Sequence, residues 1–404
     1  MKIFLTSQIR EIDRLTIEGE PISSINLMER AALSIFGWFA CNISSKSKVV
    51  VFAGHGNNGG DGLALGRLLN EVGYCVDVYL LGSNTLSPDC QINYERLNRQ
   101  GITKIRLIKS EKDFPNLNED CIVVDSLFGS GLTRPIEGVA AQLIDHINGC
   151  KAKVISIDIP SGLFGEGNPF PNNNPVVKAS ITLTLQFPKQ SFFFAENYRF
   201  VGDFEVLPIG LSPKAIDSTI SNYHYVTIDD LRTRYKPRDK FNHKGVFGHA
   251  LIVSGSKGMM GAAILASRAS IKTGCGLVTT HIPQIGYAIL QKAVPEVLVD
   301  LDIEENCFSA LDSISKYQAI AIGPGLGKSV KSVEGLSNIL NNTSIPLVID
   351  ADGLNILADN RELLAKLPKQ TIITPHPREF ERLFGTTNSG YERLQRAIEA
   401  SLKY

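Results

Sequence analysis

The chain reads Val49-Val50-Val51-Phe52-Ala53-Gly54-His55-Gly56-Asn57-Asn58-Gly59-Gly60-Asp61-Gly62 at the stretch that decides its fold. An apolar run of buried-strand length passes directly into a glycine-rich loop, and the periodic pattern of residues 62–72 predicts a helix after the loop. Glycines let the backbone approach a ligand closely, and the start of a helix points unpaired N–H groups at an anion. We therefore predict a strand–loop–helix unit that binds a nucleotide phosphate. The alternative is a tight turn that binds nothing.

Short β-branched runs alternate with helical patterns along the whole chain, which indicates an α/β fold with mostly parallel sheets. In the first half, the predicted strands are 48–53, 74–80, 121–125, 153–158, 180–185 and 203–207. A second series comprises 250–254, 277–281, 319–322, 347–350 and 371–374. An irregular stretch from 211 to 244 separates the two series. We place the domain boundary within it, which gives domains of residues 1–222 and 223–404.

The composition excludes several classes of protein. Lys+Arg and Asp+Glu both number 41 in 404 residues, so no net charge draws the chain to nucleic acid or to an anionic membrane. The seven cysteines are scattered without a C-x-x-C pair, which indicates reduced thiols in a cytoplasmic protein. We expect neither a signal peptide nor a membrane span, because the most apolar early stretch, 31–43, is too short to cross a bilayer.

Two further predicted strands each end in an acid and a short loop. Asp125 precedes a loop that contains Gly129 and Gly131, and Asp158 precedes Pro160-Ser161-Gly162. Ligands of open α/β sheets collect outside the carboxyl ends of the strands, so these loops and the glycine-rich loop should meet at one edge of the sheet. Either acid alone could instead cap a helix or a turn.

The three loops together resemble the NAD(P)H-hydrate epimerase domain, and the resemblance covers about the first 210 residues. It also includes Asn26-Leu27-Met28-Glu29-Arg30-Ala31 and Phe187-Pro188-Lys189. Members of this family equilibrate the R and S hydrates of NADH and NADPH, known as NADHX and NADPHX. The resemblance therefore implies a Rossmann-like, three-layer domain that acts on a damaged nicotinamide nucleotide, and it implies self-association of the chain.

The resemblance also implies which residues form the site. It places the hydrated nucleotide against Asn57, Asn58, Gly59, Gly60, Asp61, Gly129, Ser130, Gly131, Leu132, Thr133, Arg134, Pro135 and Asp158. It assigns a potassium ion to Asn58, Asp125 and Ser161, which all offer the hard oxygen ligands that such a cation prefers.

Inversion of the hydrated carbon requires a group that moves a proton, because either a carbon–oxygen bond or the ring must open and close again. A carboxylate in a partly dry site can be tuned to do this near neutral pH. The resemblance places Asp158 at the reacting ring, and we assign it the acid–base role. Lys189 either assists or is a surface residue. His55 departs from the family pattern, and it could simply pack against the turn.

The second half carries an ordered set of small-residue turns after its predicted strands, and each turn alone could be an ordinary βα connection. The turns lie at Gly255-Ser256, at Gly323-Pro324-Gly325, at Asp350-Ala351-Asp352-Gly353 and at Pro375-His376-Pro377. Together they resemble the ADP-dependent hydrate dehydratase domain, which has a ribokinase-like α/β fold. The resemblance implies hydrate contacts at Ala262, Gly325 and His376, and use of ADP or ATP with Mg²⁺. His376 has a competing interpretation as a helix-start residue before Glu379.

The second domain departs from its family pattern near the end of the chain. Ribokinase-like domains need a glycine-rich anion hole that ends in Gly-Asp at a helix N-terminus, and no such motif follows His376. We therefore expect a ribokinase-like domain that lacks its C-terminal part, and little dehydratase activity in this 404-residue form. We expect a longer parent protein to carry that activity. Its second domain would phosphorylate the hydroxyl group of the S hydrate, so that this group can leave.

Two other functions remain open from the sequence. A small-molecule kinase of the ribokinase type would also need the Gly-Asp anion hole. A non-catalytic nucleotide- or protein-binding module would need a degraded site, whereas Asn58, Asp61, Asp125, Asp158 and Ser161 are all present.

Overall fold

The computed structural model describes residues 1–82, 85–168 and 174–404, which form two compact units. The first unit comprises Met1–Tyr235 together with Ser389–Glu392. The second comprises Lys236–Asn388 together with Arg393–Tyr404. The boundary predicted from the sequence, near residue 222, divides the two functional domains and stays a prediction.

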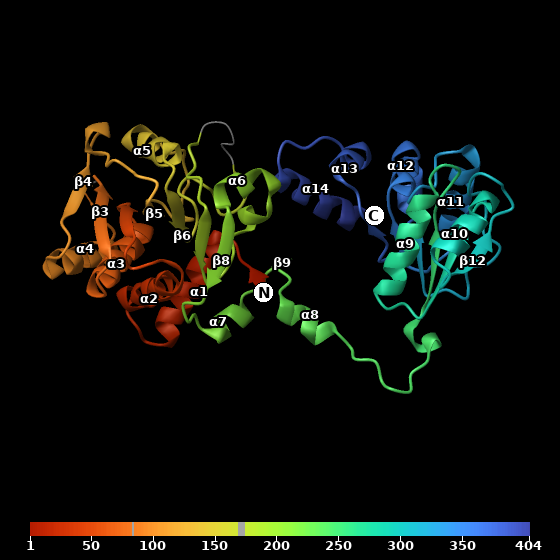
Figure 1. Cartoon of the computed structure of the whole chain (residues 1–404), viewed down its shortest axis with the longest axis horizontal. Helices are drawn as coiled ribbons and strands as arrows, with labels where there is room; N and C mark the ends of the chain where they lie inside the picture. Colours follow the sequence, from red (N-terminus) through yellow and green to blue (C-terminus); the bar gives the residue numbers. More distant parts are fainter. Residues whose placement is uncertain (83–84, 169–173) are drawn as a thin grey trace. The chain divides into compact units, whose positions relative to one another are not determined.

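The first unit contains a seven-stranded, fully parallel sheet in the order β4-β3-β2-β5-β6-β7-β8 (Figure 1). This confirms the predicted α/β class with a parallel sheet. The strands are β2 (Lys48–Ala53), β3 (Cys75–Leu81), β4 (Ile105–Ile108), β5 (Cys121–Ser126), β6 (Lys153–Ile157), β7 (Ile181–Leu185) and β8 (Asp203–Leu207). Only β4 is missing from the predicted set, because it is a short edge strand in which Arg106 and Leu107 are exposed. A separate antiparallel pair joins β1 (Lys2–Ile3) to β9 (Tyr223–His224).

Alternating side chains of β2 explain why helices cover both faces of this sheet. Val49 and Val51 pack in a cluster with residues of α2, α3 and α4, whereas Val50 and Phe52 pack in a cluster with residues of α5. Both alternating sets are apolar, as expected for a strand buried on two sides. The helices of this unit are α1 (Thr6–Gly19), α2 (Ser24–Asn42), α3 (Asn57–Glu71), α4 (Pro88–Gln100), α5 (Gly138–Gly149), α6 (Tyr198–Val201), α7 (Pro213–Ser218) and α8 (Ile228–Arg234).

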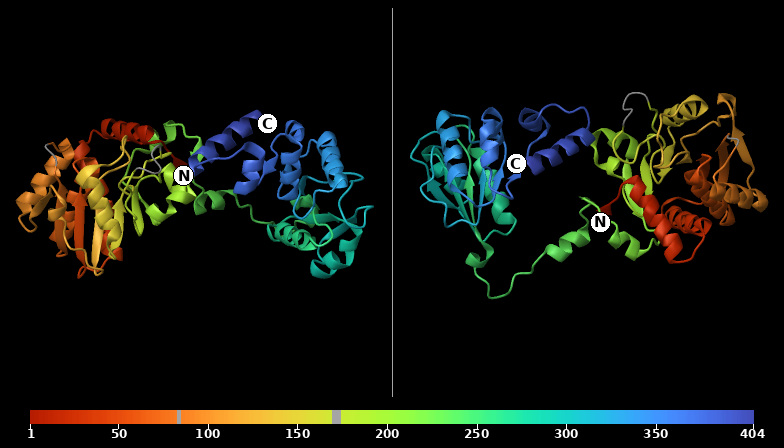
Figure 2. Two further views of the ribbon diagram at one scale, coloured as in Figure 1. Left: turned by 90° about the horizontal axis from the view of Figure 1, so that it is seen from above. Right: turned by 180° about the vertical axis from the view of Figure 1, so that it is seen from behind.

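The second unit also has helices on both faces of a parallel sheet, which has six strands in the order β12-β11-β10-β13-β14-β15. Figure 2 shows this unit, coloured green to blue, from two further sides. Ile252 of β10 packs toward α9 and α10, and its neighbours Leu251 and Val253 pack toward α11 and α12. The strands are β10 (His249–Val253), β11 (Leu277–Ile282), β12 (Leu298–Leu301), β13 (Ala319–Ile322), β14 (Leu347–Ile349) and β15 (Ile372–Ile373). The helices are α9 (Met260–Lys272), α10 (Tyr287–Ala293), α11 (Val330–Asn342), α12 (Asp352–Asp359) and α13 (Pro377–Phe384). The last helix, α14 (Gly390–Lys403), belongs to the second unit from Arg393 onward.

Within the described residues, every helix is too short or too polar to traverse a lipid bilayer.

Candidate active site

The strand order of the first unit reverses between β2 and β5, and the predicted loops meet at this point. The chain leaves β2 toward β3 and β4 on one side, and leaves β5 toward β6, β7 and β8 on the other. Such a switch point opens a crevice at the carboxyl edge of the sheet. Gly54 donates a backbone hydrogen bond to Ser126, so the ends of the two strands are tied together.

The glycine-rich segment is packed too closely for side chains at two positions. A Cβ at position 54 would lie 1.7 Å from the carbonyl oxygen of Leu127, and a Cβ at position 59 would lie 1.9 Å from that of Gly54. Gly54, Gly56 and Gly59 also have the G-x-G-x-x-G spacing of a dinucleotide-binding turn. Helix α3 begins at Asn57, five residues before the predicted start, so its free N–H groups lie within this segment.

Asp158 lies at the centre of the crevice in a strained conformation. Its φ is 64°, in the left-handed region that a non-glycine residue adopts only when its surroundings require it. Its Oδ1 accepts a 2.7 Å hydrogen bond from Nζ of Lys189. A Cβ at Gly129 would lie 4.0 Å from Oδ2 of Asp158 and 3.4 Å from Cβ of Asn58. The structure thus brings three of the predicted site segments together.

Lys189 is a buried residue, so its interpretation as a surface residue was wrong. Its side chain is 2% exposed. Besides Asp158, its ammonium donates hydrogen bonds of 3.0 Å to Oγ1 of Thr184 and 3.1 Å to the carbonyl oxygen of Phe187. All three N–H groups are used, which fixes Oδ1 of Asp158 and leaves Oδ2 toward the crevice.

Asn58, Asp125 and Ser161 are all buried, and hydrogen bonds join Asp125 to Ser161. Asp125 accepts hydrogen bonds from the hydroxyl of Ser161 at 2.5 Å and from its backbone N–H at 2.8 Å. The hydroxyl of Ser161 in turn accepts from the backbone N–H of Phe128 at 2.8 Å, next to Gly129. Both polar atoms of the Asn58 side chain are buried without a hydrogen-bond partner among the described residues. Such an orphaned oxygen is what a cation ligand leaves when the cation is removed.

The loop that follows β5 is open to solvent and borders a cleft of about 420 Å³. The cleft is lined by His55, Phe128, Leu132 and Arg134, among others. The ring of His55 meets that of Phe128 edge-on at 6.1 Å, so the packing interpretation of His55 agrees with the structure. Gly131, Thr133 and Arg134 are exposed, whereas Asp61 is only 7% exposed.

Two acids near Asp158 have strongly altered ionisation. Burial raises the pKa of Asp61 well above its ordinary value, and the charges of Asp158, Asp13 and Asp89 raise it further. Burial also raises the pKa of Asp13 to about 7, and the charge of Asp158 adds to this effect while Lys189 opposes it. Asp13 belongs to α1 and was missed from the sequence, because it stands among Glu11, Arg14 and other charged residues of an amphipathic helix.

In the second unit, two of the three predicted contact residues lie together. Gly325 has a φ of 65°, and a Cβ at this position would lie 2.9 Å from Cβ of Ala262. Ser256 donates a 2.8 Å hydrogen bond to the carbonyl oxygen of Gly325, which ties the loop after β10 to the loop after β13. A close backbone approach at strand ends is the feature that the sequence predicted.

His376 lies at the carboxyl end of β15 and caps α13. Its Nδ1 accepts a 3.2 Å hydrogen bond from the backbone N–H of Arg378, and its own backbone N–H donates to Glu379 at 3.0 Å. This reciprocal capping is the competing interpretation of His376. Among the residues that the structure describes, no hydrogen bond joins His376 to Ala262 or Gly325.

Both units match models of known protein families. Residues 24–191 match the YjeF-related protein N-terminus, and residues 250–404 match NAD(P)H-hydrate dehydratase. A bifunctional NAD(P)H-hydrate repair enzyme of Moorella thermoacetica is 32% identical, with 100% of this chain and 78% of the relative aligned. The chain belongs to this repair-enzyme family. The same enzyme of Synechocystis is 34% identical over 95% of this chain and 73% of the relative.

Two of the solved structures that resemble this chain come from yeast and from Bacillus subtilis. A yeast protein is 20% identical, with a TM-score of 0.47 over 57% of this chain and 98% of its own. The ADP/ATP-dependent NAD(P)H-hydrate dehydratase of Bacillus subtilis is 28% identical, with a TM-score of 0.34 over 44% of this chain and 60% of its own. The sequence relatives, rather than these structures, carry the family assignment. The predicted resemblance to the hydrate-repair family is thereby confirmed for both halves of the chain.

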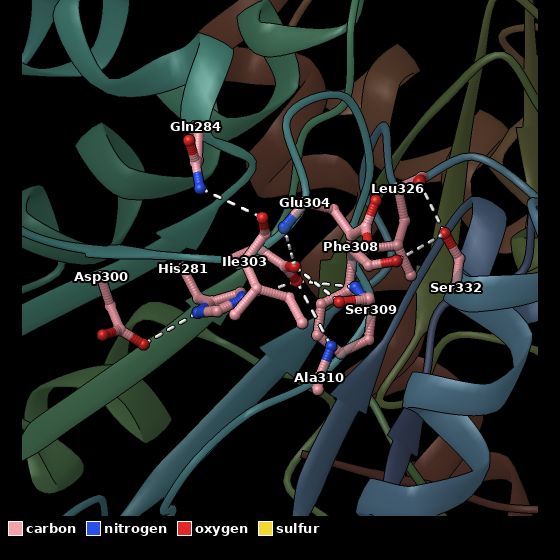
Figure 3. Close-up of polar contacts among 11 residues, drawn as sticks. His281, Gln284, Asp300, Ile303, Glu304, Phe308, Ser309, Ala310, Leu326 and Ser332 are labelled. Carbon is pink, nitrogen blue, oxygen red and sulfur yellow. Dashed lines mark hydrogen bonds and ion pairs between the residues drawn. The ribbon is translucent and has the colours of Figure 1, made fainter.

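The second unit of this repair-enzyme chain also contains a buried polar centre that no sequence pattern predicted (Figure 3). Both ring nitrogens of His281, in β11, form hydrogen bonds to carboxyl groups. Nδ1 is 2.8 Å from an oxygen of Asp300, and Nε2 is 3.1 Å from an oxygen of Asp302. Asp302 accepts further hydrogen bonds from the backbone N–H groups of Glu304 and Ser309, at 2.8 and 2.6 Å. Burial acts to raise the pKa of Asp302, but these hydrogen bonds outweigh it and hold the pKa below its ordinary value.

We expect Asp302→Asn to loosen the loop after β12. The amide NH2 would replace one carboxylate oxygen and would face either the N–H of Glu304, which donates to Oδ1, or that of Ser309, which donates to Oδ2, at a cost of about 3 kcal/mol. Hydrogen–deuterium exchange of residues 300–310 should accelerate, whereas Asp312→Asn, at an exposed site nearby, should leave it unchanged. The Asp302 carboxylate stabilises the unit at pH values above about 3.9, the pKa of an aspartate in the unfolded chain. This contribution should be lost as the pH falls through the lower pKa that Asp302 has in the folded chain. Unchanged exchange in Asp302→Asn would contradict this role.

Proposed function

We propose that the first domain interconverts the R and S epimers of NADHX and NADPHX at the crevice between β2 and β5, and that Asp158 moves the proton. The observation that carries this proposal is the strained, half-anchored Asp158 carboxylate. One oxygen is held by buried Lys189, and the other lies 4.0 Å from the position of a Cβ at Gly129, in the loop after β5. A backbone in the left-handed region is a cost that persists where function requires a particular side-chain direction.

The substrate bears a hydroxyl on the ring carbon next to the ring nitrogen. If a base takes the hydroxyl proton, the carbon–nitrogen bond can open, its electron pair passing to the nitrogen while a carbonyl forms. The nitrogen takes up a proton from an acid. Rotation of the carbonyl and closure on its other face then give the opposite epimer, with the two protons returned. Oδ2 of Asp158 is the oxygen that we assign to the hydroxyl proton.

Substrate binding at this site depends on backbone groups as much as on side chains. The start of α3 offers the free N–H groups of Asn57, Asn58 and Gly59 to a phosphate, whereas that of Gly60 already donates to Gly56. We propose that these residues and Asp61, together with the loop from Gly129 to Pro135, hold the hydrated nucleotide. The positions of Asn58, Gly129 and Asp158 around one another support this arrangement.

We propose that Asn58, Asp125 and Ser161 hold a potassium ion that orders the crevice. Their oxygen donors fit a hard monovalent cation, and the orphaned amide oxygen of Asn58 supports the assignment. In the described ranges of the chain, no three His, Cys, Asp or Glu side chains group to hold a metal, so a cation here would rely on these mixed ligands. The ion would neutralise the buried Asp125 and fix the loop that carries Gly129.

We expect potassium chloride to raise the melting temperature of the chain more than sodium chloride at equal ionic strength. At ten times the dissociation constant, a bound ion stabilises the folded state by about 1.4 kcal/mol. Ser161→Ala should remove the difference between the two salts. Ser156→Ala is the matched control, because Ser156 also donates to Asp125, at 2.7 Å, but is not a proposed ligand. Equal shifts with both salts in the unmodified chain would refute the potassium site.

For the second domain we propose dehydration of the S epimer with ADP or ATP and Mg²⁺ in a full-length parent that also supplies the Gly-Asp anion hole, with Ala262 and Gly325 against the hydrate. The family model over residues 250–404 and the close approach of the loops after β10 and β13 support this assignment. A contact from His376 stays a weaker part of the proposal, since its side chain already caps α13.

The experiment that tests the epimerase function uses pure R-NADHX and the purified chain in potassium buffer. Chromatography should show S-NADHX forming faster than in a protein-free sample, because epimers also interconvert slowly without an enzyme. A folded chain that leaves the spontaneous rate unchanged would favour a non-catalytic binding module.

A further inference from the structure

One face of α1 points its polar side chains toward the proposed active site. Thr6, Arg10 and Asp13 are spaced four and three residues apart, so they share a face of the helix. The backbone N–H of Thr6 donates a 2.6 Å hydrogen bond to Glu166, in the segment that follows Ser161. The guanidinium of Arg10 lies 2.5 Å from the position of a Cβ at Gly131. This face of α1 therefore borders the loop after β5 and the loop after β6, which flank the crevice.

The adjoining side of α1 anchors the helix near Lys189. Ile12 and Thr16 are fully buried, and Ile12 belongs to an apolar cluster with Phe4 and Phe187. The rings of Phe4 and Phe187 meet edge-on at 4.8 Å. Phe187 supplies the carbonyl oxygen that Lys189 binds. The packing that fixes α1 is thus continuous with the turn that fixes Lys189 and Asp158.

Asp13 is an ionisable side chain on this face of α1 that has no hydrogen-bond partner among the described residues. Its side chain is half-buried, and within the described residues it takes part in no hydrogen bond or ion pair. The charged groups that face it are Asp158, Asp61 and Lys189. Because burial and the charge of Asp158 raise the pKa of Asp13 to about 7, a large fraction of Asp13 is protonated at neutral pH while Asp158 is held by Lys189.

We propose that Asp13 is the second acid–base group of the epimerase site and donates the proton to the ring nitrogen while Asp158 accepts the hydroxyl proton. This inference rests on the proposed function of the first domain. Ring opening needs one base and one acid, and closure needs the same two groups in reversed roles. Lys189 is not free for this work, because its three N–H groups are all bound to Asp158, Thr184 and Phe187.

The protons balance over one turnover. In opening, the hydroxyl proton passes to Asp158, the ring carbon–nitrogen bond breaks, and the nitrogen receives the proton of Asp13. In closure on the other face of the carbonyl, Asp13 takes the nitrogen proton back, and Asp158 returns its proton to the new hydroxyl. Both groups end in their starting states, and no outside reagent is consumed.

The activity test compares Asp13→Asn, Asp13→Glu and Glu11→Gln in the conversion of R-NADHX across a pH range. Glu11 is the matched control, because it lies on the exposed side of α1 and pairs with Arg14. We expect Asp13→Asn to lose about 10²-fold of the enzymatic rate, with Asp13→Glu partly restoring it. The rate of the unmodified chain should fall as the pH rises through about 7, and the remaining rate of Asp13→Asn should lack this fall.

A stability measurement tests the same placement without substrate. A carboxyl whose folded pKa is raised costs stability progressively as the pH rises from its unfolded value to its folded value. Asp13→Asn should therefore melt at the same temperature as the unmodified chain near pH 4, and at a higher temperature above pH 7. Glu11→Gln should show no such gain.

The outcomes separate the two proposals. No enzymatic epimerisation by the unmodified, folded chain would remove the proposed function itself. An active unmodified chain with a fully active Asp13→Asn variant, or with the same pH profile in both, would overturn the role of Asp13 alone. A melting-temperature difference that does not grow with pH would overturn its placement beside Asp158.

Discussion

Asp158→Asn is expected to reduce enzymatic epimerisation by about 10²- to 10⁴-fold, the range in which positioned acid–base groups act. The amide has nearly the same size as the carboxylate and tolerates the left-handed backbone at this position, where φ is 64°. It cannot accept the hydroxyl proton of the substrate. The Lys189 ammonium can still donate to the amide oxygen, so the fold of the turn should persist.

The measurement pairs the rate of R-to-S conversion with the binding of NADHX, followed by calorimetry. Binding should change much less than the rate, because the glycine-rich segment and the start of α3 are untouched. Asp145→Asn, on the exposed side of α5, is the control and should retain both properties. A rate in Asp158→Asn equal to that of the control would remove Asp158 from the mechanism.

Gly54→Ala is expected to destabilise the first unit by about 3 kcal/mol or more, the upper end for an overpacked interior. The added methyl would lie 1.7 Å from the carbonyl oxygen of Leu127, which is backbone and cannot move aside as a side chain could. The ends of β2 and β5 would have to separate, breaking the hydrogen bond from Gly54 to Ser126. Binding of the hydrated nucleotide should fall with the stability, since the crevice opens at this point.

Gly56→Ala is the matched control two residues away. A Cβ at position 56 has nothing within 4 Å, and the φ of −93° suits any residue. Gly56 precedes α3, where exchange of a capping glycine for alanine costs about 1 kcal/mol or less. Urea unfolding monitored in the first unit should therefore separate the two variants by about 2 kcal/mol. Equal stabilities would mean that the close contact at Gly54 relaxes freely.

The strands of the two sheets could be predicted where apolar, β-branched residues run without interruption. The runs at 48–53, 203–207 and 319–322 coincide with β2, β8 and β13. The two large-sheet strands that were missed, β4 and β12, are sheet edges interrupted by Arg106 and by Asp300. A strand paired on one side only needs no continuous apolar sequence, so its pattern resembles that of a loop.

The start of α3 could not be placed from helix propensity. Asn57, Asn58 and the glycines that follow favour loops, yet they form the first turn of the helix. Tertiary packing overrides propensity here, because Gly59 must fit against Gly54 and Gly60 against Met28. The G-x-G-x-x-G spacing of Gly54, Gly56 and Gly59 could have indicated such a turn, but the interpretation of the sequence did not use it.

The candidate site residues also divide into those that the sequence could predict and those that it could not. Asp125 and Asp158 stand at strand ends, where topology brings loops together, so their convergence follows from the strand order. Asp13 and Lys189 gain their character from burial and from neighbours distant in sequence. Neither has a local pattern that separates it from a solvated charge, and only the folded chain reveals it.

The backbone of Asp158 also bears on how this domain can change over evolutionary time. A left-handed residue at the end of β6 admits glycine without strain, admits aspartate or asparagine at a moderate cost, and resists branched side chains. Exchange of aspartate for asparagine would thus remove the proton-moving group and leave the crevice, the sheet and the exposed loop after β5 intact. Loss of catalysis and loss of fold are uncoupled at this position, so a lineage of this family could pass from enzyme to inert nucleotide receptor by a single substitution.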